Sequence, residues 1–225
     1  MSEKVMLITG ATSGIGKATA LRAAAKNYKL ILTARRKSLL DDLVSTIGES
    51  RAFAVEADAT DYSQQKEVIK AGVEHWGKLD VAFANAGMGV NASGTENGDP
   101  KEWDRLIDIN VKGLLWTANL ALPHLRKTQG HFIITSSAAG RATLKGSVYG
   151  ASKWFAYGYG KNLAEEMAEW GGRCTTICPG MVNTDFFDEP KPDKLDPNDV
   201  AEAVLYATEA NPRNSIREVF LMPTN

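Results

Sequence analysis

The chain alternates short runs rich in β-branched residues with longer segments of helical periodicity, and this alternation constrains its fold most. The apolar runs predict strands at 5–9, 30–33, 51–55, 79–84, 131–135, 173–177 and 218–221. The segments between them predict helices at 15–25, 38–47, 61–76, 100–125, 147–170 and 197–210. Strands that are buried on both faces and separated by helices form a parallel sheet with right-handed crossovers. We therefore expect a doubly wound α/β fold of about seven strands with helices on both faces.

Size and composition fit one soluble domain spanning residues 1–225. Hydrophobic residues make up 44% and charged residues 24% of the 225 residues, and the formal net charge is -1. The charge shows no general attraction to nucleic acid, and no apolar run is long enough to cross a membrane. We expect a cytoplasmic protein, and Cys174 and Cys178 as two reduced core thiols rather than a metal site, because their spacing matches no metal or redox motif.

A glycine-rich turn follows the first predicted strand, in the sequence Thr9-Gly10-Ala11-Thr12-Ser13-Gly14-Ile15-Gly16. Glycines there let backbone N–H groups approach a pyrophosphate, and the next helix turns the positive end of its dipole toward it. The turn predicts a dinucleotide site, although such turns also merely connect strands to helices. The candidate cofactor-binding residues here are Gly10, Thr12, Ser13, Gly14, Ile15 and Gly16.

The second strand is followed by Arg35 and Arg36, where folds that bind NAD often carry an acidic residue. A guanidinium binds a 2′-phosphate bidentately, so this pair favours NADP(H) over NAD(H). The alternative is two solvated arginines at the start of a helix. Asp58 follows the third strand and is a candidate acceptor for the adenine amine, with a turn-forming Asp equally consistent.

A second group of polar residues suggests proton chemistry. Tyr149 and Lys153 are four residues apart at the start of a predicted helix, which places phenol and ammonium on one face. Ser136 and Ser137 follow the fifth strand at its carboxyl end, so a hydroxyl there can donate to a substrate carbonyl. Asn110 interrupts a regular helical pattern, which hints at a role beyond folding, although a surface Asn also explains it. Each feature alone is common by chance.

Together these motifs resemble the short-chain dehydrogenase/reductase family. Residues 9–16 match its TGxxxGxG motif, residues 85–87 its NAG motif, and residues 149–153 its YxxxK motif. Pro179, Gly180 and Thr184 match its PG motif, and the matches run in family order from Val5 to Pro223. The resemblance implies a Rossmann-type fold and interconversion of a carbonyl compound (ketone, aldehyde or 3-oxo acid) and its alcohol with NADP(H).

The resemblance also implies a role for each residue. Tyr149 would be the general acid/base, Lys153 would bind the nicotinamide ribose and lower the pKa of Tyr149, Ser137 would orient the carbonyl, and Asn110 would hold a water that relays protons. Cofactor contacts are further implied for Ala59, Asn85, Ala86, Gly87, Pro179, Gly180, Val182 and Thr184.

The sequence departs from the family pattern in two places. Ser136 lies thirteen residues before Tyr149 and Ser137 twelve, and the usual spacing of the active serine in the family is thirteen. The following Ala138-Ala139-Gly140 nevertheless aligns Ser137 with the active serine. Ser136 remains the alternative. The NAG motif is preceded by Ala84 where another Asn is frequent, a change we expect to be tolerated.

Substrate and partners are less well defined by the sequence. The short, Pro-containing segment after Thr184 suggests an open pocket and a small or polar substrate. Apolar residues on the helices at 100–125 and 147–170 predict a homodimer or homotetramer, unless they all face the sheet; they are Leu114, Leu115, Trp116, Trp154, Phe155, Tyr157 and Tyr159. Two rival functions are a redox sensor that binds the dinucleotide without turnover and a methyltransferase that binds S-adenosylmethionine.

Overall fold

The computed structural model describes residues 3–90 and 94–224, and its centre is a parallel sheet. The strands of these residues are β1 (Val5–Thr9), β2 (Lys29–Ala34), β3 (Ala52–Glu56), β4 (Val81–Ala84), β5 (His131–Thr135), β6 (Arg173–Pro179) and β7 (Glu218–Leu221). They form one seven-stranded sheet in the order β3-β2-β1-β4-β5-β6-β7, and every pairing is parallel. The doubly wound, Rossmann-type fold is therefore confirmed.

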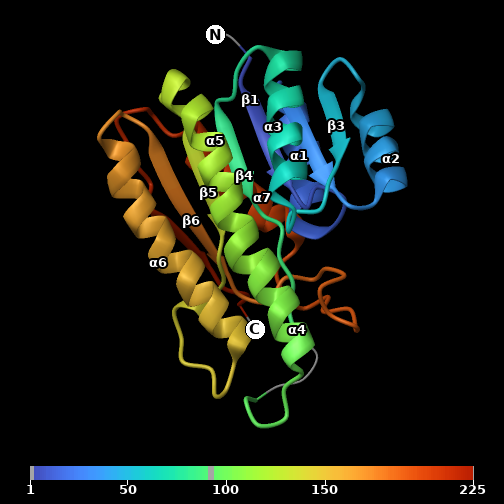
Figure 1. Cartoon of the computed structure of the whole chain (residues 1–225), viewed down its shortest axis with the longest axis vertical. Helices are drawn as coiled ribbons and strands as arrows, with labels where there is room; N and C mark the ends of the chain where they lie inside the picture. Colours follow the sequence, from blue (N-terminus) through green and yellow to red (C-terminus); the bar gives the residue numbers. More distant parts are fainter. Residues whose placement is uncertain (1–2, 91–93, 225) are drawn as a thin grey trace.

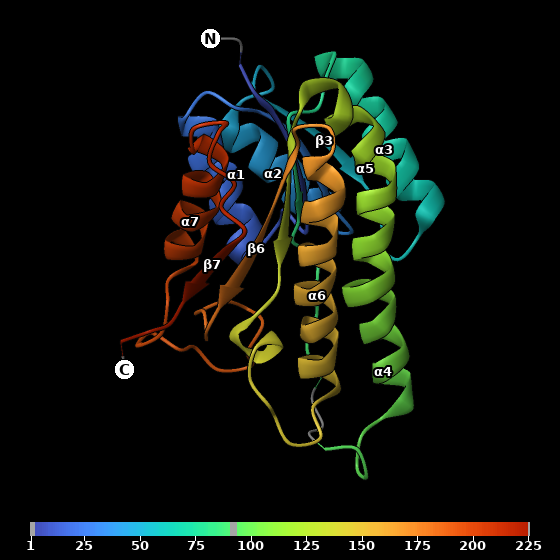
Figure 2. The same ribbon diagram turned by 90° about the vertical axis from the view of Figure 1, so that its left-hand side faces the viewer.

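Helices cover both faces of the sheet, as Figure 2 shows with the sheet seen on edge. One face carries α1 (Gly14–Ala25), α2 (Lys37–Ile47) and α7 (Pro197–Glu209), and the other carries α3 (Tyr62–Trp76), α5 (Leu114–Thr128) and α6 (Val148–Ala168) (Figures 1 and 2). Successive side chains of β1 point to opposite faces of the sheet. Val5 and Leu7 pack against α3, α5 and α6, whereas Met6 and Ile8 pack against α1, α2 and α7.

The helix predicted at 100–125 is a composite. It begins as α4 (Pro100–Ile107), widens into a π-helical segment (Asp108–Gly113) and continues as α5 to Thr128. Hydrophobic periodicity predicts the helix but not the wider segment, because one inserted residue barely disturbs the apolar pattern. Such segments frequently mark functional sites, and this one contains Asn110.

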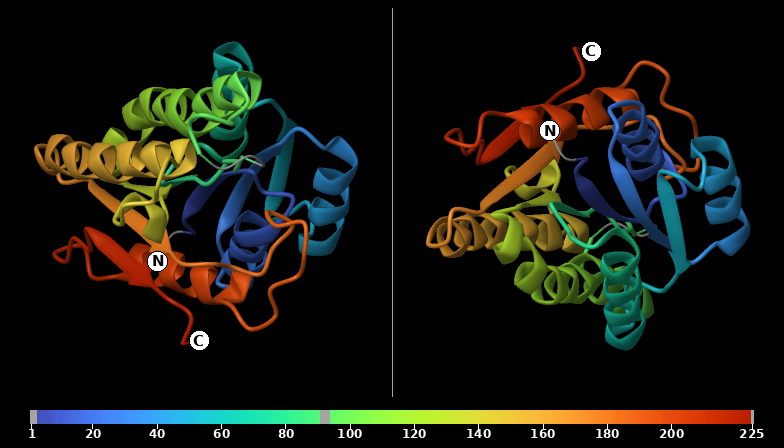
Figure 3. Two further views of the ribbon diagram at one scale, coloured as in Figure 1. Left: turned by 90° about the horizontal axis from the view of Figure 1, so that it is seen from below. Right: turned by 90° about the horizontal axis from the view of Figure 1, so that it is seen from above.

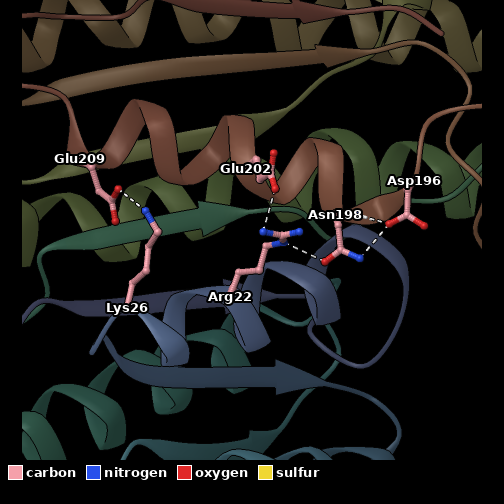
Figure 4. A network of polar contacts seen from close by, with 6 residues as sticks. All are labelled: Arg22, Lys26, Asp196, Asn198, Glu202 and Glu209. Carbon is pink, nitrogen blue, oxygen red and sulfur yellow. Dashed lines mark hydrogen bonds and ion pairs between the residues drawn. The ribbon is translucent and has the colours of Figure 1, made fainter.

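Polar contacts join α1 to α7, which lie next to each other on one face of the sheet (Figure 4). Arg22 forms a 2.8 Å ion pair with Glu202 and donates to Asn198, and Lys26 pairs with Glu209. These side chains are largely solvated, so each pair contributes about 0–1 kcal/mol. They join the helix that follows the glycine turn to the helix that follows the segment after β6.

The order of the strands determines where a ligand binds. The chain moves outward through β1, β2 and β3, then returns to the other side of β1 with β4. Doubly wound sheets bind ligands beyond the carboxyl ends of their strands at such a reversal. Figure 3 (left) views the molecule from this end. Among the described residues, none of the helices is long and apolar enough to span a bilayer.

Candidate active site

A cleft of about 1000 Å³ lies at the carboxyl end of the sheet. It is lined by the segments that follow β1, β2, β3, β4, β5 and β6, and by the start of α6. Most of the predicted residues line it: Gly10, Thr12, Ser13, Gly14, Ile15, Arg35, Arg36, Asp58, Ala59, Asn85, Ala86, Gly87, Ser137, Tyr149, Lys153, Pro179, Gly180, Val182 and Thr184. Gly16 and Asn110 do not, although both contact residues that do.

The glycine turn requires its glycines for close packing. Gly10 and Gly14 have φ values of +65° and +48°, a region that L side chains rarely adopt. At Gly16 a Cβ atom would lie 2.2 Å from the carbonyl oxygen of Gly10, so this glycine allows α1 to meet β1. Ser13 is the N-cap of α1, and its side chain makes no capping hydrogen bond there. Main-chain donors at the start of α1 therefore face the cleft without a side-chain acceptor.

The predicted arginines lie at the end of the cleft near β2. Arg36 donates a 3.3 Å hydrogen bond from Nη2 to Oγ1 of Thr12, and both arginines are exposed. Asp58 Oδ1 accepts from the amide and the hydroxyl of Thr60, at 2.8 Å each, so the turn-forming role for Asp58 is confirmed. Two positive charges therefore stand at this end of the cleft, whereas Asp58 is partly engaged within its own loop.

The NAG segment is fixed against β1. Asn85 Nδ2 donates to the carbonyl oxygen of Thr9, and the amides of Asn85 and Ala86 both donate to Thr9 Oγ1 at 3.0 Å. Thr135 Oγ1 donates to Asn85 Oδ1 across β4 and β5. The Asn side chain thus ties three strands together at the floor of the cleft, and Ala84 does not disturb this arrangement.

Tyr149 and Lys153 both line the cleft from the first turn of α6. Ser147 caps this helix by accepting from the amide of Gly150 at 2.9 Å, which explains why the helix begins here. Lys153 Nζ lies 5.8 Å from the centre of the Tyr149 ring and donates a 3.0 Å hydrogen bond to the carbonyl oxygen of Thr135. Lys153 is buried, so its charge acts within a confined space.

Burial changes the acidity of both groups. It lowers the pKa of Lys153 to about 8, because the ammonium loses its hydration. Burial also raises the pKa of Tyr149, while a hydrogen bond with Ser137 acts in the opposite direction. The direction for Tyr149 is opposite to the lowering that was expected from Lys153, since loss of hydration outweighs any effect of the ammonium in the protein alone. Phenolate formation therefore needs further positive charge in the cleft.

The two serines after β5 have different environments. Ser136 is buried, and its hydroxyl donates a 2.8 Å hydrogen bond to the main-chain oxygen of Lys153. The hydroxyl of Ser137 accepts from the amide of Ala139 and donates a 3.4 Å hydrogen bond to the carbonyl oxygen of Pro179. Both serines line the cleft, and of the two it is Ser137 that acts on the pKa of the Tyr149 phenol.

Asn110 is buried, so the interpretation of it as a surface residue is wrong. Its Oδ1 accepts from the amide of Met88, and its Nδ2 donates to the carbonyl oxygen of Met88 and to Oγ of Ser152. All three bonds are 2.9–3.0 Å long. The side chain thus joins the π-helical segment to the NAG loop and to α6. The side chain therefore positions these elements, and the water that the family resemblance implies for Asn110 stays a prediction.

Two residues that line the cleft, Gln65 and Phe186, were not predicted as site residues from the sequence. Gln65 lines the cleft and is buried on α3, where its Nε2 donates to the carbonyl oxygens of Ala59 and Gly113. A polar residue on the apolar stripe of Val68 and Ile69 was the available signal. Phe186 also lines the cleft, but no periodicity marks a loop residue of this kind.

Comparison with known proteins identifies the family. The family model for short chain dehydrogenases matches residues 4–195. The chain belongs to the short-chain dehydrogenase family. It is thus an oxidoreductase of that family, which rules out the methyltransferase alternative.

Relatives of this family resemble the chain over nearly its whole length. An uncharacterized oxidoreductase of Staphylococcus saprophyticus is 35% identical and covers 99% of this chain and 98% of its own. The structure of an alcohol dehydrogenase from the archaeon Thermococcus sibiricus, complexed with 5-hydroxy-NADP, is 27% identical with a TM-score of 0.92, covering 99% and 97% of the two chains. A 3-ketoacyl-(acyl-carrier-protein) reductase from Brucella melitensis, complexed with NADH, is 27% identical with a TM-score of 0.89, covering 98% and 97%.

Proposed function

We propose that this protein is an NADP(H)-dependent oxidoreductase that interconverts a carbonyl compound and its alcohol, with Tyr149 as general acid/base. The observation that carries the proposal is the placement of Tyr149, Lys153 and Ser137 around one cleft. A phenol, a buried ammonium and a hydroxyl there offer a proton, positive charge and a hydrogen bond to the same small space.

The residues present fit a nicotinamide dinucleotide. The cleft volume of about 1000 Å³ suits a large ligand, and the main-chain donors at the start of α1 suit its pyrophosphate. Thr33 lines the cleft near the end of β2, and its buried Oγ1 has no hydrogen-bond partner among residues 3–90 and 94–224, as expected for a group that a ligand satisfies. Related structures that contain such dinucleotides support the same choice.

The preference for NADP(H) rests on Arg35 and Arg36. Their charges stand at the end of the cleft where a 2′-phosphate would lie, and Arg36 is oriented by Thr12. The Thermococcus alcohol dehydrogenase was determined with an NADP derivative, whereas the Brucella reductase was determined with NADH. The choice between NADP(H) and NAD(H) therefore has to be argued from the charged residues of this chain.

The chain's own residues would perform the following steps. The bound nicotinamide supplies or accepts the hydride. Lys153 would bind the ribose hydroxyls and keep positive charge beside the phenol, Ser137 would hold the carbonyl oxygen, and Tyr149 would donate its proton to that oxygen during reduction. Because burial raises the pKa of Tyr149, the phenol is protonated at neutral pH, as reduction requires.

Loss of reduced-nicotinamide absorbance with a panel of aldehydes and ketones tests this function. We expect turnover by the wild type and a loss of at least about 100-fold in kcat for Tyr149→Phe, because the proton donor is removed while the ring remains. Cofactor binding without turnover of any carbonyl or alcohol would instead support the redox sensor, in which these residues serve binding alone.

Cofactor choice has a separate test. Arg35→Asp and Arg36→Asp add a negative charge beside the 2′-phosphate, so each should weaken NADP(H) binding far more than NAD(H) binding. Fluorescence titration of both reduced cofactors measures the two dissociation constants. Equal losses for both cofactors would remove the case for the preference.

We further propose that residues 1–225 form one domain that works as a homodimer or homotetramer in the cytoplasm. Of the side chains expected at an interface, Leu114 is buried in the core, whereas Trp154 and Phe155 on α6 are exposed. Exposed aromatic side chains of this size support an interface along α6. Light scattering on the purified protein, compared with Trp154→Glu, measures the subunit count.

A further inference from the structure

Several large apolar side chains that line the cleft are exposed. Leu144, Met181, Phe186 and Met222 are 48%, 51%, 44% and 53% exposed, and all four line the cleft. Single exposed apolar residues are ordinary, but several around one concave site indicate a surface that a ligand covers. The two loops that contribute most of them follow β5 and β6, on either side of the phenol.

Phe186 lies nearest to the proposed chemistry. The centre of its ring is 5.7 Å from that of Tyr149, at an interplanar angle of 55°, and 5.4 Å from that of Phe187. Any substrate whose carbonyl oxygen reaches the phenol must therefore place its neighbouring groups beside this ring. An aromatic wall at that distance favours planar apolar groups, with which it stacks edge to face or offset.

Gly89 allows the ring to reach this position. A Cβ atom at residue 89 would lie 2.9 Å from Cζ and 3.1 Å from Cε1 of Phe186, closer than carbon atoms tolerate. The segment after β4 therefore meets the segment after β6 across the cleft, through a glycine and an aromatic ring. Neither residue belongs to the motifs that carry the family resemblance.

Charge at this end of the cleft does not select an ionised substrate. Apart from Lys153 behind the phenol, the charged lining residues there are Lys145 and Asp185, which have opposite signs and are both exposed. The arginines and Asp58 line the opposite end, at β2 and β3. Among the described residues there, a carboxylate on the substrate would therefore lose hydration beside apolar side chains and would meet Asp185, which repels it, as well as Lys145.

We propose that the substrate is a neutral carbonyl compound with a ring or similarly bulky apolar group next to the carbonyl, and that Phe186, seated on Gly89, determines this specificity. The inference rests on the proposed function and deepens it. It differs from the small or polar substrate that the short segment after Thr184 suggested, because the length of that segment does not reveal which side chains line the cleft.

The test compares three aldehydes with NADPH: 4-methylbenzaldehyde, 4-carboxybenzaldehyde and propanal. The variants are Phe186→Ala, Phe186→Leu and Gly89→Ala, and the matched control is Phe220→Ala, which removes an equally exposed ring (47%) that does not line the cleft. We expect the wild type to prefer 4-methylbenzaldehyde over its 4-carboxy analogue by about tenfold in kcat/KM, or about 1.4 kcal/mol.

Phe186→Ala should lower kcat/KM for 4-methylbenzaldehyde by about tenfold and that for propanal by less than about twofold. Phe186→Leu should retain part of the activity, Gly89→Ala should shift the ring and act in the same direction, and Phe220→Ala should change nothing. KM for NADPH should change less than kcat/KM for 4-methylbenzaldehyde, because these substitutions leave in place the main-chain amide of Phe186 that donates to Thr184.

Two failures are distinguishable. If the wild type reduces the aldehydes but shows no preference, or if Phe186→Ala affects all three equally, the specificity inference is overturned and the proposed function stands. If the wild type turns over no aldehyde, ketone or alcohol, the proposed function fails and this inference fails with it.

Discussion

The hydroxyl of Ser136 donates a 2.8 Å hydrogen bond to the main-chain oxygen of Lys153. This bond ties the end of β5 to the first turns of α6, and Gly140 packs against the same carbonyl group. The two serines thus have different roles. The hydroxyl of Ser136 fixes the helix that carries Tyr149 and Lys153, and that of Ser137 acts on the phenol. Spacing along the chain could not separate these roles, since both serines lie at the same end of β5.

This division predicts different results for the two Ser→Ala variants. Ser137→Ala should lower kcat by about 100-fold or more with little change in Tm, because it removes a donor to the reacting oxygen. Ser136→Ala should lower the free energy of unfolding by about 1 kcal/mol, since it removes one buried hydrogen bond to a carbonyl that also accepts within α6, and should affect kcat less. Steady-state kinetics and thermal melts of both variants check this. The reverse pattern would make Ser136 the active serine.

Asn110 should behave as a positioning residue. Asn110→Ala removes the side-chain partner from the half-buried amide and carbonyl of Met88, so we expect a loss of about 1–3 kcal/mol in the free energy of unfolding. Asn119→Ala, at an exposed position on α5, is the control and should change stability by less than about 0.5 kcal/mol. Urea denaturation measures both. Unchanged stability of Asn110→Ala alongside lost activity would show a direct role in proton transfer instead.

The fold was largely predictable because its signals are local and repeated. Each predicted strand agrees with the observed one within two residues, from β1 at Val5–Thr9 to β7 at Glu218–Leu221. The apolar runs specify these strands, and turns such as the one after Thr9 specify the direction changes. Parallel strands with right-handed crossovers then leave few topologies. The residues that line the cleft follow from the same rule, since they lie at the carboxyl ends of the strands.

What could not be predicted depends on contacts between distant segments. The burial of Asn110 depends on how the segment after β4 passes α6, and the place of Phe186 depends on a glycine almost a hundred residues earlier. The raised pKa of Tyr149 likewise results from burial by several elements. Hydrophobic periodicity reports which face of an element is covered, but not what covers it.

Lys153 should lower the free energy of unfolding, although the protein needs it for activity. Its pKa falls from 10.5 in the unfolded chain to about 8, so between these values the unfolded state binds more protons and stability rises with pH. At neutral pH the full penalty applies, on the order of 3 kcal/mol, offset in part by the bond to Thr135. We therefore expect Lys153→Met to raise the free energy of unfolding by about 1–2 kcal/mol while activity falls at least about 100-fold.

Thermal melts at pH 7 and pH 10 provide the check for Lys153. The gain in Tm should be present at pH 7 and should shrink at pH 10, where the wild-type amine is largely neutral in the folded protein. Lys161→Met on the exposed side of α6 is the control and should change little at either pH. A Tm that falls at pH 7 in Lys153→Met would mean that the buried ammonium stabilises the fold.

His131 is a buried group away from the cleft whose environment predicts acid sensitivity. It begins β5 and is 1% exposed. Thr175 Oγ1 donates to the carbonyl oxygen of Ile216, so it accepts from His131 Nε2 at 2.7 Å, and Nδ1 is left without a partner. Burial, with Arg173 and Lys4 nearby, lowers the pKa of His131 to about 3. The ring is therefore neutral in the folded protein.

A lowered pKa in the folded state means that only the unfolded chain binds a proton between pH 6.5 and about 3. Protonation of His131 thus leaves the free energy of unfolding unchanged above pH 6.5 and lowers it as the pH falls below 6.5. Between pH 7 and pH 5 we expect the wild type to lose about 2 kcal/mol through His131. His131→Asn does not titrate, so its free energy of unfolding should fall by about that much less over the same range. Urea denaturation at pH 5, 6 and 7 measures both slopes, and equal slopes for the wild type and His131→Asn would show that His131 becomes protonated without unfolding the chain.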